Sequence, residues 1–237
     1  MPLNKSTGNM YKFITHTWNT IKGECPHGCS YCYMKRWGKQ PPLHFDETEL
    51  KTELGKGNFI FIGSSCDMFA ESIPENWVNQ TITKIEYDDP YNDKNKYLFQ
   101  TKNPHRFFDC FYARYLEDMG RYASYYFCTT LETNRHYKNI MDSAPPVNER
   151  VCWTREIPFD KYITVEPIMD FDLPEFIKMI KSCDPVQVNI GADSSQKRNK
   201  LPEPPKEKIL ELIEELEKFT TVVQKKNLKR LLKRGDK

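Results

Sequence analysis

The sequence predicts an α/β fold, a partial, open (βα)6 barrel with a helical extension at its C-terminal end. Strand-like segments alternate with helical segments along the 237 residues, and this alternation is typical of a parallel sheet with helices outside it. Six such units are too few to close an eight-stranded barrel. The composition, 38% hydrophobic and 13% aromatic, is that of a globular chain with a sizeable core.

Six segments have the composition of strands. Phe59-Ile60-Phe61-Ile62 is a continuous apolar run ended by Gly63, the pattern of a strand covered on both faces. The other expected strands are residues 12–17, 96–101, 124–130, 162–165 and 186–190, with residues 221–224 as a candidate for one more.

Helical patterns lie between these strands. The last long one, residues 205–219, places Ile209, Leu212, Ile213 and Leu216 on one stripe, as expected for a helix packed on a core. Residues 134–158 are hard to assign because Pro145-Pro146 interrupts any long helix. The other expected helices are residues 30–37, 74–87, 106–119 and 173–182, and residues 147–156 are expected to form a helical turn or two.

We expect three parts in the chain: a polar, flexible N-terminus (residues 1–11), the barrel (residues 12–224) and a basic tail (residues 225–237) packed on the barrel or extending from it. The tail has seven Lys or Arg and one acid, whereas the preceding chain has 28 bases and 32 acids. Such a tail is either a solvated helix end or a contact for nucleic-acid phosphate. Residues 1–20 lack the apolar core of a signal peptide and no apolar run reaches spanning length, so we expect a cytoplasmic protein without a membrane partner.

Three of the eight cysteines lie in the loop Cys25-Pro26-His27-Gly28-Cys29-Ser30-Tyr31-Cys32. Three soft ligands on one loop, without a second pair, suit an iron–sulfur cubane with one open iron better than a tetrahedral zinc site. The alternatives are a zinc loop with His27 as a fourth ligand and three ordinary buried cysteines. Buried packing is expected for the scattered cysteines Cys66, Cys110, Cys128, Cys152 and Cys183.

The spacing Cys25-x-x-x-Cys29-x-Tyr31-Cys32, with an aromatic residue before the last cysteine, resembles the cluster loop of radical S-adenosylmethionine (radical SAM) enzymes. The resemblance implies a [4Fe–4S] cluster on Cys25, Cys29 and Cys32, with S-adenosyl-L-methionine (SAM) on the fourth iron. One electron would then cleave SAM to a 5′-deoxyadenosyl radical that abstracts hydrogen from a substrate. It also implies a partial barrel and an electron donor of the flavodoxin or ferredoxin type.

In parallel α/β folds the ligand site lies at the carboxyl ends of the strands. Ser64, Ser65 and Asp67 follow the second strand, where radical SAM proteins usually carry a small-residue motif that meets the amino group of SAM. This chain has Gly-Ser-Ser instead of two glycines and an acid, and Asp67 is the candidate for the missing carboxylate. The other expected SAM-binding residues are Tyr31, Thr130 and Glu132.

Two further strand ends carry candidates for the catalytic residues. Lys102 follows the third strand and is expected to pair with the SAM carboxylate or a substrate anion. Glu166 follows the fifth strand and is expected to face the substrate. For both Glu132 and Glu166 the alternative is charge compensation at a helix N-terminus.

Five landmarks together are similar to a compact radical SAM-like family frequent in bacteriophage genomes, with spore photoproduct lyase as a more distant analogue. This resemblance implies an isomerase or lyase acting on a nucleobase, for example hypermodified thymine in phage DNA, in the host cytoplasm. Tyr31, Tyr33 and Trp37 are then candidates for stacking on an extruded base. A radical SAM enzyme of small molecules or peptides and a non-catalytic nucleic-acid-binding metal or cluster module are the alternatives. The landmarks are Thr17-Trp18-Asn19, Gly63 to Phe69, Phe99-Gln100-Thr101-Lys102, Thr129-Thr130-Leu131-Glu132 and Val165-Glu166-Pro167-Ile168.

Overall fold

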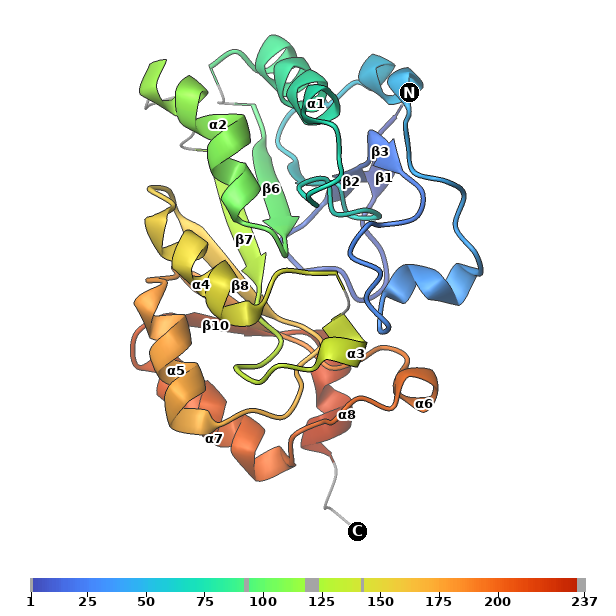
Figure 1. Ribbon diagram of the computed structural model, residues 1–237. Coiled ribbons are helices and arrows are strands. Elements are labelled where there is room, and N and C mark those ends of the chain that lie inside the picture. Colours follow the sequence, from blue (N-terminus) through green and yellow to red (C-terminus); the bar gives the residue numbers. More distant parts are fainter. Residues whose placement is uncertain (1, 92–93, 118–123, 142, 234–237) are drawn as a thin grey trace.

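The computed structural model describes residues 2–91, 94–117, 124–141 and 143–233, and it is built on one eight-stranded sheet (Figure 1). The strand order is β1-β2-β5-β6-β7-β8-β9-β10, and every neighbouring pair is parallel except β1 with β2. This open, mostly parallel sheet confirms the expected α/β partial barrel. The strands are β1 (Asn4–Lys5), β2 (His16–Trp18), β5 (Phe59–Ile62), β6 (Lys96–Thr101), β7 (Tyr125–Thr130), β8 (Lys161–Val165), β9 (Gln187–Ile190) and β10 (Thr221–Gln224).

The longer helices run along the outer face of the curved sheet (Figure 1). Five of them match expected helices: α1 (Glu75–Asp88), α2 (His105–Glu117), α4 (Val147–Glu156), α5 (Leu173–Ser182) and α7 (Lys206–Glu217). Residues 118–119 of the expected third helix and residues 234–237 of the basic tail lie outside the described residues. The short helical elements are η1 (Tyr33–Trp37), η2 (Glu47–Lys51), α3 (Lys138–Met141), α6 (Gln196–Asn199), η4 (Lys226–Leu228) and α8 (Lys229–Leu232).

Both faces of the sheet are covered. The helix-side core contains a group of interlocked rings, in which Phe99 lies 5.1 Å from Phe111 and Phe107 lies 4.9 Å from Phe127 between ring centroids. On the inner face, Tyr11 and Ile14 of the N-terminal segment pack with side chains from β5, β6 and β7. This double coverage explains why β5 has a continuous apolar sequence rather than an alternating one.

The N-terminal part of the chain differs from the sequence expectation in three ways. The first parallel strand, β2, begins at His16 and is therefore shorter than the strand expected at residues 12–17. β1 pairs with β2 in the antiparallel direction. A separate two-stranded sheet joins β3 (Ile21–Lys22) to β4 (His44–Phe45) on either side of the cysteine loop. The helix expected at residues 30–37 is only the 3-10 helix η1, because Cys32 has an extended ψ of 124°. Short pairings of two or three residues leave little pattern in a sequence.

Two further expectations concern the last strand and the membrane. β10 pairs parallel with β9, so the candidate strand at residues 221–224 is confirmed. Among the described residues, the helices are too short or too polar to cross a membrane.

Candidate active site

The cysteine loop lies at the edge of the sheet where the parallel strands end. It has no regular secondary structure, and its turns are tight: Gly28 N–H donates to Cys25 O and Cys32 N–H donates to Cys29 O, both at 3.1 Å. Gly28 takes a φ of 63°, which favours glycine at this turn. Ser30 N–H donates to Ile140 O at 3.0 Å, which anchors the loop on α3.

The thiols of the loop differ in exposure and environment. Cys29 is buried, while Cys25 and Cys32 are half-buried, and all three are free. Cys25 packs against the core cluster that contains the buried Cys66, and a hydrogen bond from the Cys66 thiol lowers the pKa of Cys25 to about 6. The same bond raises the pKa of Cys66. Burial raises the pKa of Cys29.

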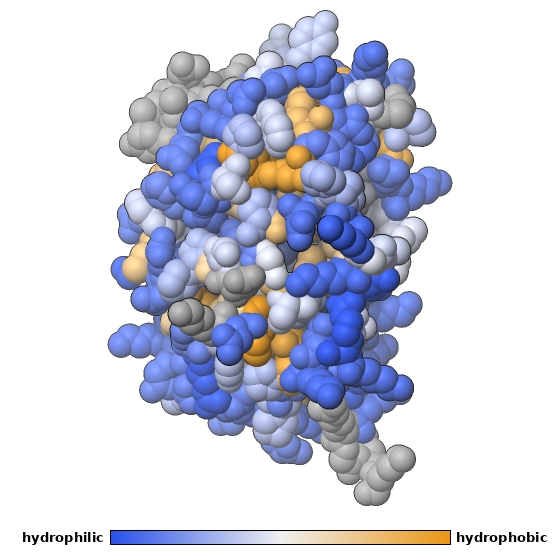
Figure 2. Space-filling model, turned by 45° about the vertical axis from the view of Figure 1, so that its right-hand side comes forward, coloured by the Kyte–Doolittle hydropathy of each residue, from blue (hydrophilic) through white to orange (hydrophobic). Residues whose placement is uncertain are grey.

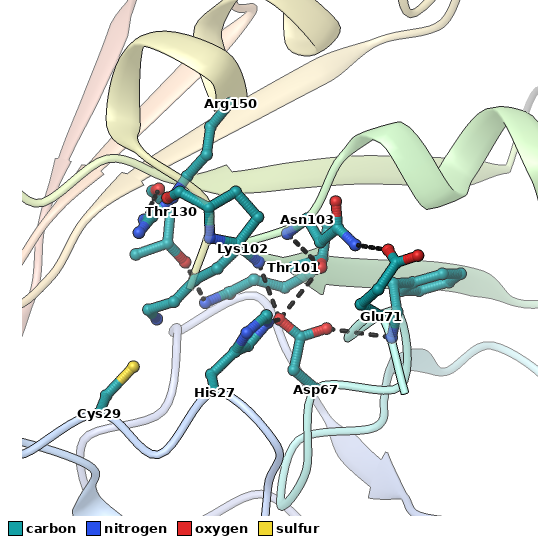
Figure 3. Close-up of polar contacts among 12 residues, drawn as sticks. His27, Cys29, Asp67, Glu71, Thr101, Lys102, Asn103, Thr130 and Arg150 are labelled. Carbon is teal, nitrogen blue, oxygen red and sulfur yellow. Dashed lines mark hydrogen bonds and ion pairs between the residues drawn. The ribbon is translucent and has the colours of Figure 1, made fainter. Parts of the chain in front are cut away.

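Asp67 connects the cysteine loop to the ends of β5 and β6. Its Oδ2 accepts hydrogen bonds from His27 Nε2 at 2.9 Å, Thr101 Oγ1 at 3.0 Å and the Lys102 backbone N–H at 2.8 Å (Figure 3). Burial opposes ionisation of Asp67, but His27 and these donors outweigh it and lower the pKa of Asp67. The pKa of His27 is raised, because the attraction of Asp67 outweighs the burial of the imidazole.

Glu132 is the centre of a second, largely buried group, in which the side chains of Glu132 and Arg150 are fully buried. Its Oε2 accepts a hydrogen bond from Arg150 Nη1 at 2.8 Å, and its Oε1 accepts one from the Tyr31 hydroxyl. Lys102 Nζ lies 3.6 Å from Glu132 Oε1 and 5.6 Å from the centre of the Tyr31 ring. Arg150 also donates to Pro145 O at 2.7 Å and to Thr130 O at 2.9 Å, so it fixes the end of β7.

Charge and burial compete in this second group. Burial opposes ionisation of Glu132, but Arg150 and Lys102 lower the pKa of Glu132 below its usual range. Burial also opposes the charge of Lys102, and Glu132 outweighs it and raises the pKa of Lys102. Two cations therefore face one carboxylate in this buried group, which leaves it positive and suited to an anionic ligand.

Glu166 lies in a third group that joins the two ends of the chain. Its carboxylate accepts hydrogen bonds from Asn9 Nδ2 at 2.9 Å, Asn227 Nδ2 at 3.0 Å and Lys225 Nζ. Lys225 Nζ also lies 4.0 Å from the centre of the Tyr11 ring. A Cβ on Gly191 would lie 2.7 Å from Glu166 Cδ, so only glycine leaves room for this carboxylate.

Tyr11 and Gln100 link this third group to the end of β7. Tyr11 donates its hydroxyl hydrogen bond at 2.8 Å to Gln100 Oε1 or at 2.9 Å to Thr164 Oγ1. Gln100 Nε2 in turn donates to Thr130 Oγ1 at 3.3 Å. Thr130 thus lies between the group around Glu132 and the group around Glu166.

Ser64 and Ser65 are held by a residue of the lead-in to the cysteine loop. Asn19 Oδ1 accepts from Ser64 Oγ at 3.1 Å and from Ser65 N–H at 2.9 Å. Tyr33 donates to Ser64 O at 2.6 Å. The two serines therefore lie directly beside the cysteine loop.

The structure sorts the predicted site residues into two sets. Tyr31, Asp67, Lys102 and Glu132 surround the cysteine loop with Ser64 and Ser65. Glu166 belongs instead to the group formed with residues 9 and 225–227, and Thr130 connects the two sets. Tyr31 is 7% exposed and is bound to Glu132, so it is not available for stacking.

Sequence reasoning missed several residues of these groups. They are His27 as the partner of Asp67, the buried Arg150, and Asn9, Tyr11, Lys225 and Asn227 around Glu166. Arg150 lies in a helix that carries no motif, so no local signal marked it. Among the scattered cysteines, Cys66, Cys110, Cys128 and Cys183 are buried as expected, whereas Cys152 is exposed.

The cysteine loop offers three free thiols as ligands. Among the described residues, no three or more His, Cys, Asp or Glu side chains are grouped so that they could hold one metal ion. One tetrahedral zinc ion would draw its thiolates to about 3.8 Å of each other, whereas each thiolate of a four-iron cluster binds a different iron. His27 Nε2 is bound to Asp67, so this ring nitrogen is not a free ligand. Three free thiols on one loop are the donor set that a cluster requires.

The surroundings of the loop also suit a polar ligand. Arg150 Nη2 and Ser65 Oγ are buried atoms without a hydrogen-bond partner in the described part of the chain. A buried donor without a partner is costly, and a bound carboxylate or hydroxyl would satisfy it. The positive group around Glu132 and the serine turn thus offer contacts for the carboxylate and amine of an amino-acid moiety such as that of SAM.

Comparisons with known proteins give little for this chain. No protein-family model matches it, and no curated protein matches it. Among solved structures it is similar to the crystal structure of methylornithine synthase (PylB), at 12% identity, with 93% of this chain and 77% of that chain covered and a TM-score of 0.49. At this identity and score the likeness carries no conclusion about the site.

Proposed function

We propose that this chain is a radical SAM enzyme. The observation that carries the proposal is the loop with Cys25, Cys29 and Cys32, which lies at the carboxyl edge of a parallel sheet beside Asp67 and the positive group around Glu132. When bound, a [4Fe–4S] cluster and SAM would supply an electron and an adenosyl radical able to remove hydrogen from a substrate carbon.

Each group of side chains has a role in this proposal. Cys25, Cys29 and Cys32 hold the cluster, and Asp67 positions the loop through His27. Lys102 and Arg150 bind the carboxylate of SAM, because they leave the group around Glu132 with excess positive charge. Ser64 and Ser65 contact its amine. Tyr31 holds Glu132 by donating a hydrogen bond to it, and Thr130 holds Arg150 by accepting one at its backbone oxygen.

The third group provides a place for the substrate. Glu166, with Asn9, Lys225 and Asn227, presents a carboxylate, an ammonium and two amides at the ends of β8 and β10. These groups could bind the polar edge of a nucleobase. We therefore propose a base, such as a modified thymine in phage DNA, as the substrate, with isomerisation or bond cleavage as the outcome. A small molecule or peptide with similar polar groups is the second candidate.

The test is anaerobic reconstitution with iron and sulfide, followed by addition of dithionite and SAM. We expect about four irons and four sulfides per chain, a broad brown absorbance, and formation of 5′-deoxyadenosine. Cys32→Ala should lose the cluster, whereas Cys152→Ala, which removes an exposed cysteine on α4, should keep it. A cluster-loaded protein that forms no 5′-deoxyadenosine would instead favour a non-catalytic cluster module. Zinc in place of iron would favour a zinc-stabilised nucleic-acid-binding module.

The proposed cytoplasmic electron donor can be tested in the same assay. A flavodoxin or ferredoxin with its reductase should replace dithionite and sustain formation of 5′-deoxyadenosine. Formation with dithionite but not with either protein would contradict a donor of this type.

A further inference from the structure

Two segments around the cysteine loop carry basic side chains without any acid. Residues 25–45 include Lys35, Arg36 and Lys39, and residues 194–202 include Lys197, Arg198 and Lys200, and neither range contains Asp or Glu. All six basic side chains are exposed. We call these six residues the basic rim. Outside the rim and the basic tail (residues 225–237), the chain has 22 bases against 32 acids, so the rim is one of two places where positive charge is concentrated.

The fold brings the two halves of the rim together. Arg198 Nη2 donates to Cys32 O at 3.3 Å, which joins α6 to the cysteine loop, and Lys35 Nζ donates to Gly28 O at 3.1 Å. In Figure 1, α6 and the blue 3-10 helix η1 lie on the same side of the molecule. Figure 2 turns this side forward and shows a largely hydrophilic face. The rim therefore lies directly beside the cysteine loop.

Two exposed aromatic rings are interleaved with these cations. Trp37 is 63% exposed and Tyr33 is 39% exposed, and their ring centroids are 5.7 Å apart at an interplanar angle of 79°. The Arg36 guanidinium lies 5.1 Å from the centre of the Trp37 ring and 5.8 Å from that of Tyr33. An exposed tryptophan next to a guanidinium is a stacking surface for bases, and every base has a face that can use it.

We propose that the basic rim binds the phosphate backbone of single-stranded nucleic acid, with Trp37 stacking on a base next to the one that enters the site. The combination of acid-free positive charge and an exposed stacking ring favours a polyanion with planar bases over an acidic protein, whose side chains would not use Trp37 in this way. The inference deepens the proposed function, since it rests on a nucleobase as the substrate.

The experiment measures fluorescence anisotropy of a labelled single-stranded DNA 20-mer with the cluster-loaded protein across a salt series. Lys39→Glu/Lys197→Glu should weaken binding about tenfold at about 0.1 M salt and lower the slope of log affinity against log salt by about 1.4, as expected for two lost phosphate contacts. Trp37→Ala should weaken binding about fivefold or more with the slope unchanged. The matched control Lys56→Glu/Lys178→Glu reverses two exposed lysines elsewhere and should change binding much less.

Three results would overturn the proposal. They are no binding of the DNA by the wild-type protein, an equal loss in the control, and rim variants that keep wild-type affinity. If the rim variants instead impair reduction by an acidic flavodoxin and DNA does not bind, the rim belongs to the electron donor. Formation of 5′-deoxyadenosine in the same sample tests the proposed radical SAM activity separately. If SAM is cleaved but DNA does not bind, the result rejects the nucleic-acid-binding role of the rim and leaves the radical SAM activity standing.

Discussion

His27 Nε2 lies 2.9 Å from Asp67 Oδ2, and this contact joins the cysteine loop to the turn after β5. The side chains are 5% and 12% exposed, respectively, so the pair is largely shielded from water. Asp67 also accepts the backbone N–H groups of Phe69 and Lys102, at 3.1 Å and 2.8 Å. One carboxylate thus holds three segments of the site in register.

We expect His27 and Asp67 to be energetically coupled. A double-mutant cycle with His27→Gln and Asp67→Asn in cluster-free protein should give a coupling of about 1–3 kcal/mol in the free energy of unfolding by urea. Each single variant loses the same charged, shielded hydrogen bond, so the double variant should lose less stability than the two single variants added together. The helix-surface pair Lys84 and Asp88 serves as the control and should give about 0.3–0.5 kcal/mol. Equal couplings for the two pairs would contradict the role assigned to Asp67.

Arg150→Met should destabilise the protein by about 3–5 kcal/mol, because it leaves Glu132 as a buried carboxylate without its main partner. Arg150→Lys should recover only part of this loss, since one ammonium cannot reach Glu132, Pro145 O and Thr130 O together. Urea unfolding monitored by circular dichroism measures both. As a control, Arg135→Met removes a guanidinium whose side chain is 36% exposed and should have a much smaller effect.

Gly191→Ala should destabilise the protein by about 1–3 kcal/mol, because the added methyl group would overlap the carboxylate of Glu166. The cost should nearly vanish in a Glu166→Ala background, where the space is free. Thermal unfolding of the single and double variants tests this. The same cost in both backgrounds would place the strain in the backbone instead.

The Lys22–Asp46 pair predicts a pH dependence of stability. Hydrogen bonds from Lys22 and Thr48 lower the pKa of Asp46 to about 2. Because the folded-state pKa is depressed, the stabilisation is present above the ordinary Asp pKa near 4 and is lost as pH falls toward 2. The pair is partly exposed, so the effect should be below about 1 kcal/mol. Asp46→Asn should flatten the unfolding free energy between these pH values, and an unchanged slope would contradict the prediction.

Much of the fold could be predicted because its signals are local. The continuous apolar run of β5 and the striped face of α7 follow from the sequence itself, since periodicity reports which side of an element is buried. The spacing of Cys25, Cys29 and Cys32 is a local pattern as well, and the structure places this loop beside the ends of β5 and β6. β1, β3 and β4 were missed because strands of two residues carry no period.

The sequence by itself determined the alternation of strands and helices, the cysteine loop and the strand-end positions of Asp67, Lys102, Glu132 and Glu166. Only the tertiary structure decided which of these meet. It paired Asp67 with His27, buried Arg150 against Glu132, and moved Glu166 into a separate group with Asn9 and Lys225. The reason is physical: buried charges must find partners, and those partners lie 18 to 157 residues away along the chain, a distance that no local pattern records.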